Sequence, residues 1–191
     1  MNHLIIYIHP NPKSFCHAIL ETLKKTLRAK GGEVRVRDLY DMKLNPVMKK
    51  AELKPGTPVA KDVKREQNHI KWADTMTWIY PIWWQRMPAI GNGYIDRVLL
   101  EGFAHENTPT GPKGLLGDKK VFMINTMNAP TAVYEQSGLF NSMRQTIDEG
   151  VFGYCGMKVI NHKYFGLVAH VSYEERKKML DEVKVFAKTI L

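Results

Sequence analysis

Three short stretches of this chain carry residue types that could bind a ligand. HPNPKSFCH (residues 9–17) places a lysine and a serine where a helix would begin, and the free backbone amides of a helix start can hold a phosphate. PIWWQ (residues 81–85) places two large flat rings behind a proline, which suits stacking against a planar heteroaromatic ligand. TMNAPTAVYEQSG (residues 126–138) supplies groups that could hydrogen-bond the polar edge of that ligand. Together, these features predict a site for a flavin nucleotide.

Each of these stretches also has a simpler interpretation. Ser14 could merely cap its helix, and Trp83 and Trp84 could fill the core or a subunit contact. Tyr134 could be an ordinary surface tyrosine. The two glycines of GNGYID (residues 91–96) fall inside a predicted helix instead of after a strand, so we expect them to permit close packing and not to bind phosphate.

The hydrophobic pattern predicts the elements that must position these residues. Five short apolar or alternating runs predict strands, and amphipathic segments between them predict helices. The strands are expected at residues 4–9, 33–39, 75–82, 119–126 and 158–166. The helices are expected near residues 18–30, 59–74, 87–100, 139–150 and 172–190, with Pro88 in the first turn of the third and Ser172 and Glu175 forming a capping box on the last.

Strands that alternate with helices are typical of an α/β protein with a parallel sheet covered on both faces. In such sheets a ligand lies at the carboxyl ends of the strands. The three ligand-binding stretches come directly after the first, third and fourth predicted strands. This coincidence is the strongest evidence from the residues themselves that they form one site.

Composition narrows the class of protein. The 191 residues are 44% apolar, so we expect a single domain over residues 1–191. No apolar run is long enough to span a membrane, which predicts a soluble, cytoplasmic protein. Two isolated cysteines predict reduced thiols, and the scattered histidines indicate no metal site. The net charge of +9 resides mainly in helix-like segments, so we expect solvated helix faces and no nucleic-acid partner.

Five motifs resemble one known family along nearly the whole chain. They are HPNPKSFCHAI after the first strand, DLYDMKLNPVM after the second, YPIWWQRMPAI with YIDRVL around the third, GLLGDKKVFMINT along the fourth and YCGMKVI before the fifth. This set resembles the flavodoxin-like NAD(P)H:quinone oxidoreductases, which include DT-diaphorase, the modulator-of-drug-activity reductases and the ancillary reductases of potassium-efflux systems.

The resemblance implies a flavodoxin-like, doubly wound sheet in the order 2-1-3-4-5. It also implies a homodimer with the active site at the subunit interface. A bound flavin, FAD or FMN, would take hydride from NADPH or NADH and pass two electrons to a quinone, nitroaromatic or azo acceptor in a ping-pong cycle.

The resemblance also implies roles for individual residues. Those around the flavin's phosphates and ribose would be His9, Ser14, Phe15 and Cys16. Those along the ring system would be Pro81, Ile82, Trp83, Trp84 and Gln85, and those at its pyrimidine side Thr126, Met127, Asn128 and Tyr134. Arg176 would lie near the adenosine portion, which favours FAD over FMN. The catalytic candidates are Tyr134 for proton delivery and His105 at the mouth of the pocket.

The chain departs from the family pattern at three of these places. Met127 and Asn128 replace a glycine pair, and Phe140 replaces a relay histidine, so the proton could come from Tyr134, from water or from the acceptor. His105 stands where DT-diaphorase has tyrosines at the pocket mouth. Two other functions stay open: a redox-sensing regulatory subunit of a membrane potassium-efflux transporter, and a one-electron flavodoxin-type carrier, although such carriers are usually acidic.

Overall fold

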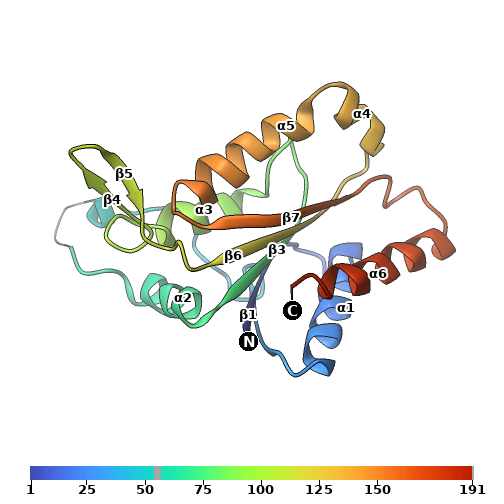
Figure 1. The fold of residues 1–191 in the computed structure, drawn as a ribbon, viewed down its shortest axis with the longest axis horizontal. Helices are drawn as coiled ribbons and strands as arrows, with labels where there is room; N and C mark the ends of the chain where they lie inside the picture. The colour runs from blue at the N-terminus through green and yellow to red at the C-terminus, as the bar shows by residue number, and fades with distance from the viewer. Residues whose placement is uncertain (54–56, 191) are drawn as a thin grey trace.

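The structure is a computed structural model that describes residues 1–53 and 57–190. Its centre is a sheet of five parallel strands in the order β2-β1-β3-β6-β7 (Figure 1). The strands are β1 Asn2–Tyr7, β2 Glu33–Asp38, β3 Thr75–Pro81, β6 Lys120–Thr126 and β7 Lys158–Phe165. Counted among the five, this is the doubly wound order 2-1-3-4-5 that we expect from the sequence.

Helices cover both faces of the sheet. On one face, α1 (Phe15–Ala29) and α6 (Tyr173–Ala187) pack side by side against apolar side chains of β1, β3 and β6. The other face is covered by α2 (Lys61–Trp72), α3 (Ala89–Val98) and the π-helix η2 (Gln145–Gly153), which continues the short helix α5 (Leu139–Arg144). The remaining short helices are η1 (Lys50–Leu53) and α4 (Thr131–Gln136).

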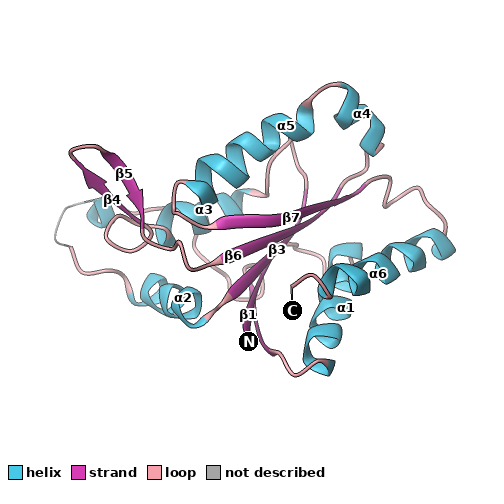
Figure 2. Ribbon diagram, viewed as in Figure 1, coloured by secondary structure: helices cyan, strands magenta, loops and turns pink. Residues whose placement is uncertain are grey.

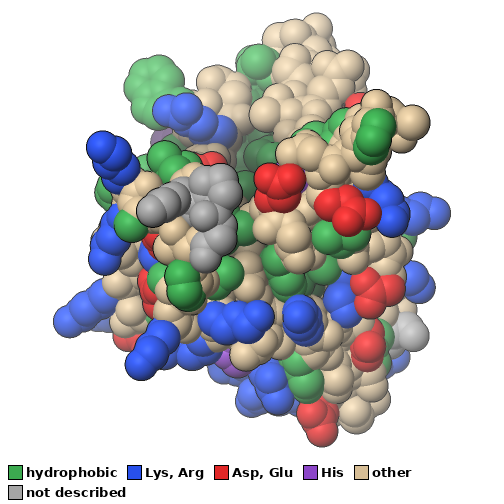
Figure 3. Space-filling view, turned by 90° about the vertical axis from the view of Figure 1, so that its left-hand side faces the viewer, with side chains coloured by type: hydrophobic (Ala, Val, Ile, Leu, Met, Phe, Trp, Pro, Cys, Tyr) green, Lys and Arg blue, Asp and Glu red, His purple; other side chains and the backbone are tan. Residues whose placement is uncertain are grey.

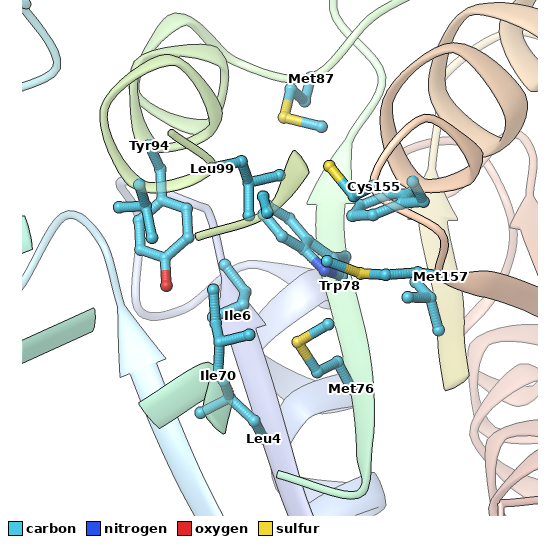
Figure 4. Close-up of a cluster of buried hydrophobic side chains, with 14 of the residues drawn as sticks. Leu4, Ile6, Ile70, Met76, Trp78, Met87, Tyr94, Leu99, Cys155 and Met157 are labelled. Carbon is cyan, nitrogen blue, oxygen red and sulfur yellow. The ribbon is translucent and has the colours of Figure 1, made fainter. Parts of the chain in front are cut away.

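Trp78 of β3 lies in the middle of the larger core. Its ring meets the ring of Tyr94 from α3 at 5.7 Å and that of Phe152 from η2 at 5.2 Å. Figure 4 shows Trp78 between Tyr94 on one side and Cys155 and Met157 on the other. Aromatic rings in such tilted contacts bury a large apolar area at one point, which fixes α3 and η2 against the sheet.

Both cysteines are buried free thiols, as expected. The basic residues also lie where the sequence predicts. Along α2, Lys61, Lys64 and Lys71 face solvent, while Asp62 and Glu66 turn toward arginines of neighbouring elements. Figure 3 shows Lys and Arg side chains spread over one such solvated face. Within residues 1–53 and 57–190, no helix has the length and apolar character needed to cross a membrane.

Three local features differ from the sequence-based expectation. The sequence predicts a loop over residues 101–118, but this segment contains an antiparallel hairpin of β4 (His105–Thr108) and β5 (Gly111–Gly114). The strand GPKG lacks apolar alternation, and the hairpin packs backbone against backbone, with Gly114 against Gly156. Helix α4 was not expected, and Pro88 is the N-cap of α3 instead of a first-turn residue.

The capping box and the two helix glycines are confirmed. Ser172 accepts a hydrogen bond from the Glu175 amide, and the Glu175 carboxylate accepts one from the Ser172 amide. Gly91 lies against the side chain of Ile8, the residue that directly follows β1. Gly93 lies against Pro46, which lets the segment after β2 cross α3 closely.

Replacing Gly93 with alanine tests this contact. The new Cβ would lie 2.3 Å from the Cβ and the carbonyl oxygen of Pro46. We expect the free energy of unfolding to fall by about 2 kcal/mol, because backbone must move to accept the methyl group. Urea denaturation measures the loss, and Gly117→Ala, whose Cβ would find its nearest neighbour at 3.6 Å, is the control. Equal stability of the two variants would contradict the close approach.

His3 is a buried polar residue at the start of β1. Its Nδ1 lies 2.6 Å from the Thr75 hydroxyl and its Nε2 lies 3.0 Å from the Thr77 hydroxyl. Burial lowers the pKa of His3 from 6.5 to about 4. The imidazole is therefore neutral near pH 7, with both ring nitrogens paired to hydroxyl groups.

The depressed pKa of His3 predicts a pH-dependent stability. Between about pH 6.5 and pH 4 the unfolded chain binds a proton at His3 that the folded chain does not. The stabilisation is therefore fully present above pH 6.5 and falls by about 3 kcal/mol as the pH drops through this window. Thermal or urea unfolding should show a smaller loss for His3→Gln than for the wild type. Identical slopes would show that His3 titrates alike in both states.

Candidate functional site

The carboxyl ends of β1, β3 and β6 lie side by side at one edge of the sheet. Just after the paired strands, the Ile82 amide donates to the Thr126 carbonyl at 2.8 Å, and the Ile8 amide donates to the Ile79 carbonyl at 2.9 Å. Figure 2 shows the connecting loops leaving the sheet from this edge. The three stretches with ligand-binding residue types therefore start at the ends of three neighbouring strands.

The first stretch forms an ordered turn into α1. The Asn11 amide donates to His9 Nδ1 at 3.0 Å, and the Lys13 amide donates to Asn11 Oδ1 at 2.8 Å. Ser14 is the N-cap: its hydroxyl accepts from the His17 amide at 3.2 Å and lies 3.3 Å from the Tyr7 hydroxyl. The other amides of the first helical turn are left for a ligand, and the helix dipole favours an anion there.

Burial disfavours the charged forms of three side chains around this turn. It raises the pKa of the Tyr7 hydroxyl and of the Cys16 thiol to about 12 each, and it lowers the pKa of His9. Cys16 is therefore a thiol and not a thiolate nucleophile near pH 7. Its Sγ lies 3.1 Å from the Thr126 hydroxyl, which connects the first stretch to the end of β6.

The second stretch forms a tight turn that holds two tryptophans at the surface. The backbones of Trp83 and Arg86 exchange two hydrogen bonds of 2.9 and 3.1 Å around a two-residue turn. Within it, Trp84 has φ 52° and Gln85 has φ 58°, a conformation that costs non-glycine residues on the order of 1–3 kcal/mol each. Strain of this kind is typical of functional sites. Pro81 and Ile82, just before the turn, are buried.

The tryptophan side chains do not fill the core of this chain. Trp84 is 87% exposed and Trp83 is 42% exposed. The Trp83 ring meets His9 of the first stretch edge-on at 6.4 Å. The interpretation of both rings as core-filling residues is therefore wrong within one protomer, and both are free to contact a ligand or another chain.

The third stretch combines buried and exposed groups. Thr126 and Met127 are buried, whereas Asn128 is exposed. Tyr134 lies on α4, is 9% exposed, and belongs to a small apolar cluster at this edge of the sheet. That cluster, which joins the second and third stretches, comprises Ile82, Met127, Tyr134, Phe140 and Met143.

A cavity of about 400 Å³ lies between the start of α1 and the start of α6. Arg176 lines it and is held by its Nη1, which donates to the Val168 carbonyl at 3.3 Å and the Val171 carbonyl at 2.9 Å. The charged residues of the lining are all cationic. The cavity is lined by Lys13, Ser14, Phe15, Ala18, Val168, Tyr173, Arg176, Lys177 and Leu180.

Three residues of the cavity were not predicted from the sequence, although a signal was present: Tyr173, Lys177 and Leu180. Together with Arg176 they recur at three- and four-residue spacing after the Ser172 cap, which places them on one face of α6. The spacing identifies a shared face. It does not reveal that this face meets the beginning of α1, about 160 residues away in the chain.

His105 lies apart from the other candidates within one protomer. It is on β4, and its ring packs at 5.0 Å against Tyr154, just before β7 begins. The hairpin therefore lies near the amino ends of β6 and β7, and Figure 1 shows it at the opposite side of the molecule from α4 and α6. The role of His105 in catalysis stays a prediction that one chain alone does not support.

The residue types at the site suit the binding of an organic molecule. Across the part of the chain that the structure describes, no three His, Cys, Asp or Glu side chains come together as a metal-binding group. The groups that do come together are a helix start, cationic side chains, flat rings and backbone amides at strand ends. Such a set can bind a phosphate-bearing heteroaromatic molecule.

Comparison with known proteins agrees with this arrangement. The family model of the flavodoxin-like fold matches residues 1–187. An uncharacterized NAD(P)H oxidoreductase of Haemophilus influenzae is 35% identical over 184 residues, covering 95% of this chain and 91% of that protein. NAD(P)H dehydrogenase (quinone) 1 of Rattus norvegicus is 26% identical over 210 residues, covering 98% of this chain and 76% of that protein.

A solved structure shows the same architecture. The NAD(P)H:quinone oxidoreductase of Methanothermobacter marburgensis superposes with a TM-score of 0.91 at 25% identity, covering 100% of this chain and 99% of that one. The strand order, the match over almost the whole chain and the relatives all point to one group. The chain belongs to the flavodoxin-like family of NAD(P)H:quinone oxidoreductases, and the protein is an oxidoreductase.

Proposed function

We propose that the protein uses a bound flavin to pass electrons from NADPH or NADH to quinones or to related nitroaromatic and azo acceptors. The observation that carries this proposal is the cationic cavity at the start of α1. The loop that leads into α1 also contacts one of the two exposed tryptophans at the strand ends, through His9 and Trp83. When bound there, the flavin supplies the two-electron redox chemistry, and the protein supplies binding and orientation. The named relatives support the donor and acceptor classes.

The residues present fit a flavin dinucleotide. The amides at the start of α1, Ser14 and Lys13 suit the phosphates, because a helix start favours anions. FMN ends with its phosphate, so it would reach no further than the start of α1. The cavity extends on to α6, where Phe15 and Leu180 offer apolar walls and Arg176 offers a cation for an adenosine portion. We therefore favour FAD over FMN.

The ring system would lie along the ends of β3 and β6. The backbone amide of Asn128 could donate to the edge of the ring where negative charge develops, whereas the Met127 amide already donates to the Phe165 carbonyl at 2.9 Å. Tyr134 could supply a proton from its hydroxyl. We infer that donor and acceptor use the same place beside the exposed Trp83 and Trp84 in turn, which is a ping-pong cycle.

Two features support a homodimer with the site at the interface. Trp84 exposes most of a large apolar ring on a rigid turn. Exposed apolar side chains of this kind are typical of a surface that a partner chain covers. The β4–β5 hairpin with His105 lies far from the site of its own chain. We propose that two-fold pairing brings the hairpin of one copy to the strand ends of the other.

We also propose that the protein is cytoplasmic, because its two free thiols suit the reducing environment of the cytoplasm.

Substitution of the tryptophans tests the proposed site. We expect Trp84→Ala to lower kcat/KM for a quinone about tenfold, because the acceptor loses a stacking surface, whereas Trp84→Phe should retain most of it. The measurement is steady-state oxidation of NADPH with a quinone by flavin-loaded protein. Trp83→Ala should also weaken flavin binding, given its contact with His9. Unchanged flavin content and turnover in both alanine variants would refute the assignment.

Removal of the Arg176 side chain tests the choice of flavin. We expect Arg176→Ala to raise the Kd for FAD about tenfold and to leave the Kd for FMN nearly unchanged, since only FAD reaches α6. Flavin fluorescence quenching measures both constants. The matched control is Lys178→Ala, an exposed cation of the same helix outside the cavity. Equal losses of FMN and FAD affinity would favour an FMN enzyme instead.

A further inference from the structure

Arg86 is an exposed cation beside the two tryptophans, and the proposed function gives it no role. It ends the strained turn after β3, where its backbone exchanges two hydrogen bonds of 2.9 and 3.1 Å with Trp83. The two residues therefore stand directly opposite each other as an antiparallel pair. Side chains at such positions leave the backbone on the same face, with their Cβ atoms about 5 Å apart. The Arg86 side chain thus starts beside that of Trp83.

The backbone around Arg86 is fixed on both sides. Before it, Trp84 and Gln85 have φ values of 52° and 58°, which non-glycine residues rarely adopt. After it, Met87 is buried and Pro88 is the N-cap of α3. The cation therefore projects from a set place, and only its side chain can adjust to a ligand.

In the part of the chain that the structure describes, the Arg86 guanidinium forms no ion pair. By contrast, the buried Arg97 of α3 is held by the carboxylates of Glu52 and Asp62, at 2.7 and 2.8 Å. A guanidinium without a carboxylate partner keeps its fork of N–H donors, whose geometry matches the oxygens of a phosphate. Arg86 is therefore available to an anionic ligand.

Arg86 lines a cavity of about 310 Å³ between the turn, α3 and α5. Met143 of α5 also lines it and belongs to the apolar cluster at the strand ends, so the cavity adjoins the proposed place of the ring system. Among the described residues of this lining, Arg86 alone is charged. The other polar residues are neutral: Gln85, Asn92, Ser142 and Thr146.

A second cavity beside Arg86 is less suited to an anion. It measures about 350 Å³, and its lining includes the carboxylate of Asp96, which repels negative charge. The first cavity, with a cation and neutral hydrogen-bonding groups, is therefore the one that fits a phosphate.

We propose that Arg86 is a specificity-determining residue that binds a phosphate of the nicotinamide dinucleotide donor in the cavity between the turn, α3 and α5. This inference rests on the proposed function. The cations of the cavity between α1 and α6 would serve the phosphates of the flavin, so the donor needs a cation of its own. Arg86 lies next to the tryptophans beside which the nicotinamide would stack. It thereby favours dinucleotides over a dihydronicotinamide riboside, which has no phosphate.

Steady-state kinetics with different electron donors tests this role. For Arg86→Gln we expect the KM for NADPH to rise about tenfold with kcat nearly unchanged, because a phosphate contact is lost while the reacting ring keeps its place. Oxidation of dihydronicotinamide riboside should stay as in the wild type, which a merely structural role would not allow. Arg86→Lys keeps the charge and should restore most of the loss. The matched control is Arg65→Gln, which removes one exposed cation of α2 and should behave as the wild type.

The two dinucleotides identify the phosphate. NADH and NADPH share a pyrophosphate, and NADPH alone carries a 2′-phosphate. A rise in KM for both donors would assign Arg86 to the pyrophosphate, and a rise for NADPH alone would assign it to the 2′-phosphate. Either result supports the proposal, whereas an equal loss with all donors, the riboside included, would overturn it.

Binding without turnover completes the test. Calorimetric titration of the flavin-loaded protein with NADP+ should give a Kd about tenfold higher for Arg86→Gln than for the wild type. An unchanged Kd contradicts the proposal, and so does a wild-type dimer that Arg86→Gln converts to a monomer in gel filtration, because the cation would then serve the subunit contact. A protein that oxidises no donor refutes the proposed function, and calorimetry with NADP+ still decides whether Arg86 binds its phosphates.

Discussion

The pairing of β3 with β6 holds the candidate site together. These neighbouring strands end with Pro81 opposite Thr126, and the next amide, that of Ile82, donates to the Thr126 carbonyl. The strained turn of Trp84 and the segment that leads to Tyr134 therefore leave the sheet from neighbouring strand ends. A slip of one residue would turn alternate side chains to the opposite face, so every ligand-binding group assigned to these two segments depends on this register.

Two histidines of one sheet meet different hydrogen-bond partners. His3 meets two threonine hydroxyls near the amino ends of the strands, and burial keeps it neutral. His162 meets a carboxylate on one side and an amide oxygen on the other. The first histidine stabilises the fold toward higher pH.

Much of the fold was predictable because local patterns encode it. Five strands and the main helices follow from apolar periodicity, and the capping box at Ser172 and Glu175 was visible as a motif. The close packing of Gly93 followed from its place inside a helix. The β4–β5 hairpin escaped prediction because its backbone contacts, such as Gly114 on Gly156, have no side-chain pattern. The site loops were predictable as strand ends, since parallel strands bring those ends together.

The sequence by itself thus determined the five strands of the sheet, where they end and which residue types gather there. The tertiary structure alone decided which distant residues meet. It placed Arg176 beside Ser14, exposed Trp84, separated His105 from the other candidates and joined His162 to Asp148 and Asn125. The physical reason is that periodicity reports only whether a side chain faces the core. Which side chains face one another depends on the order and register of the strands, and these are set by packing over the whole sheet.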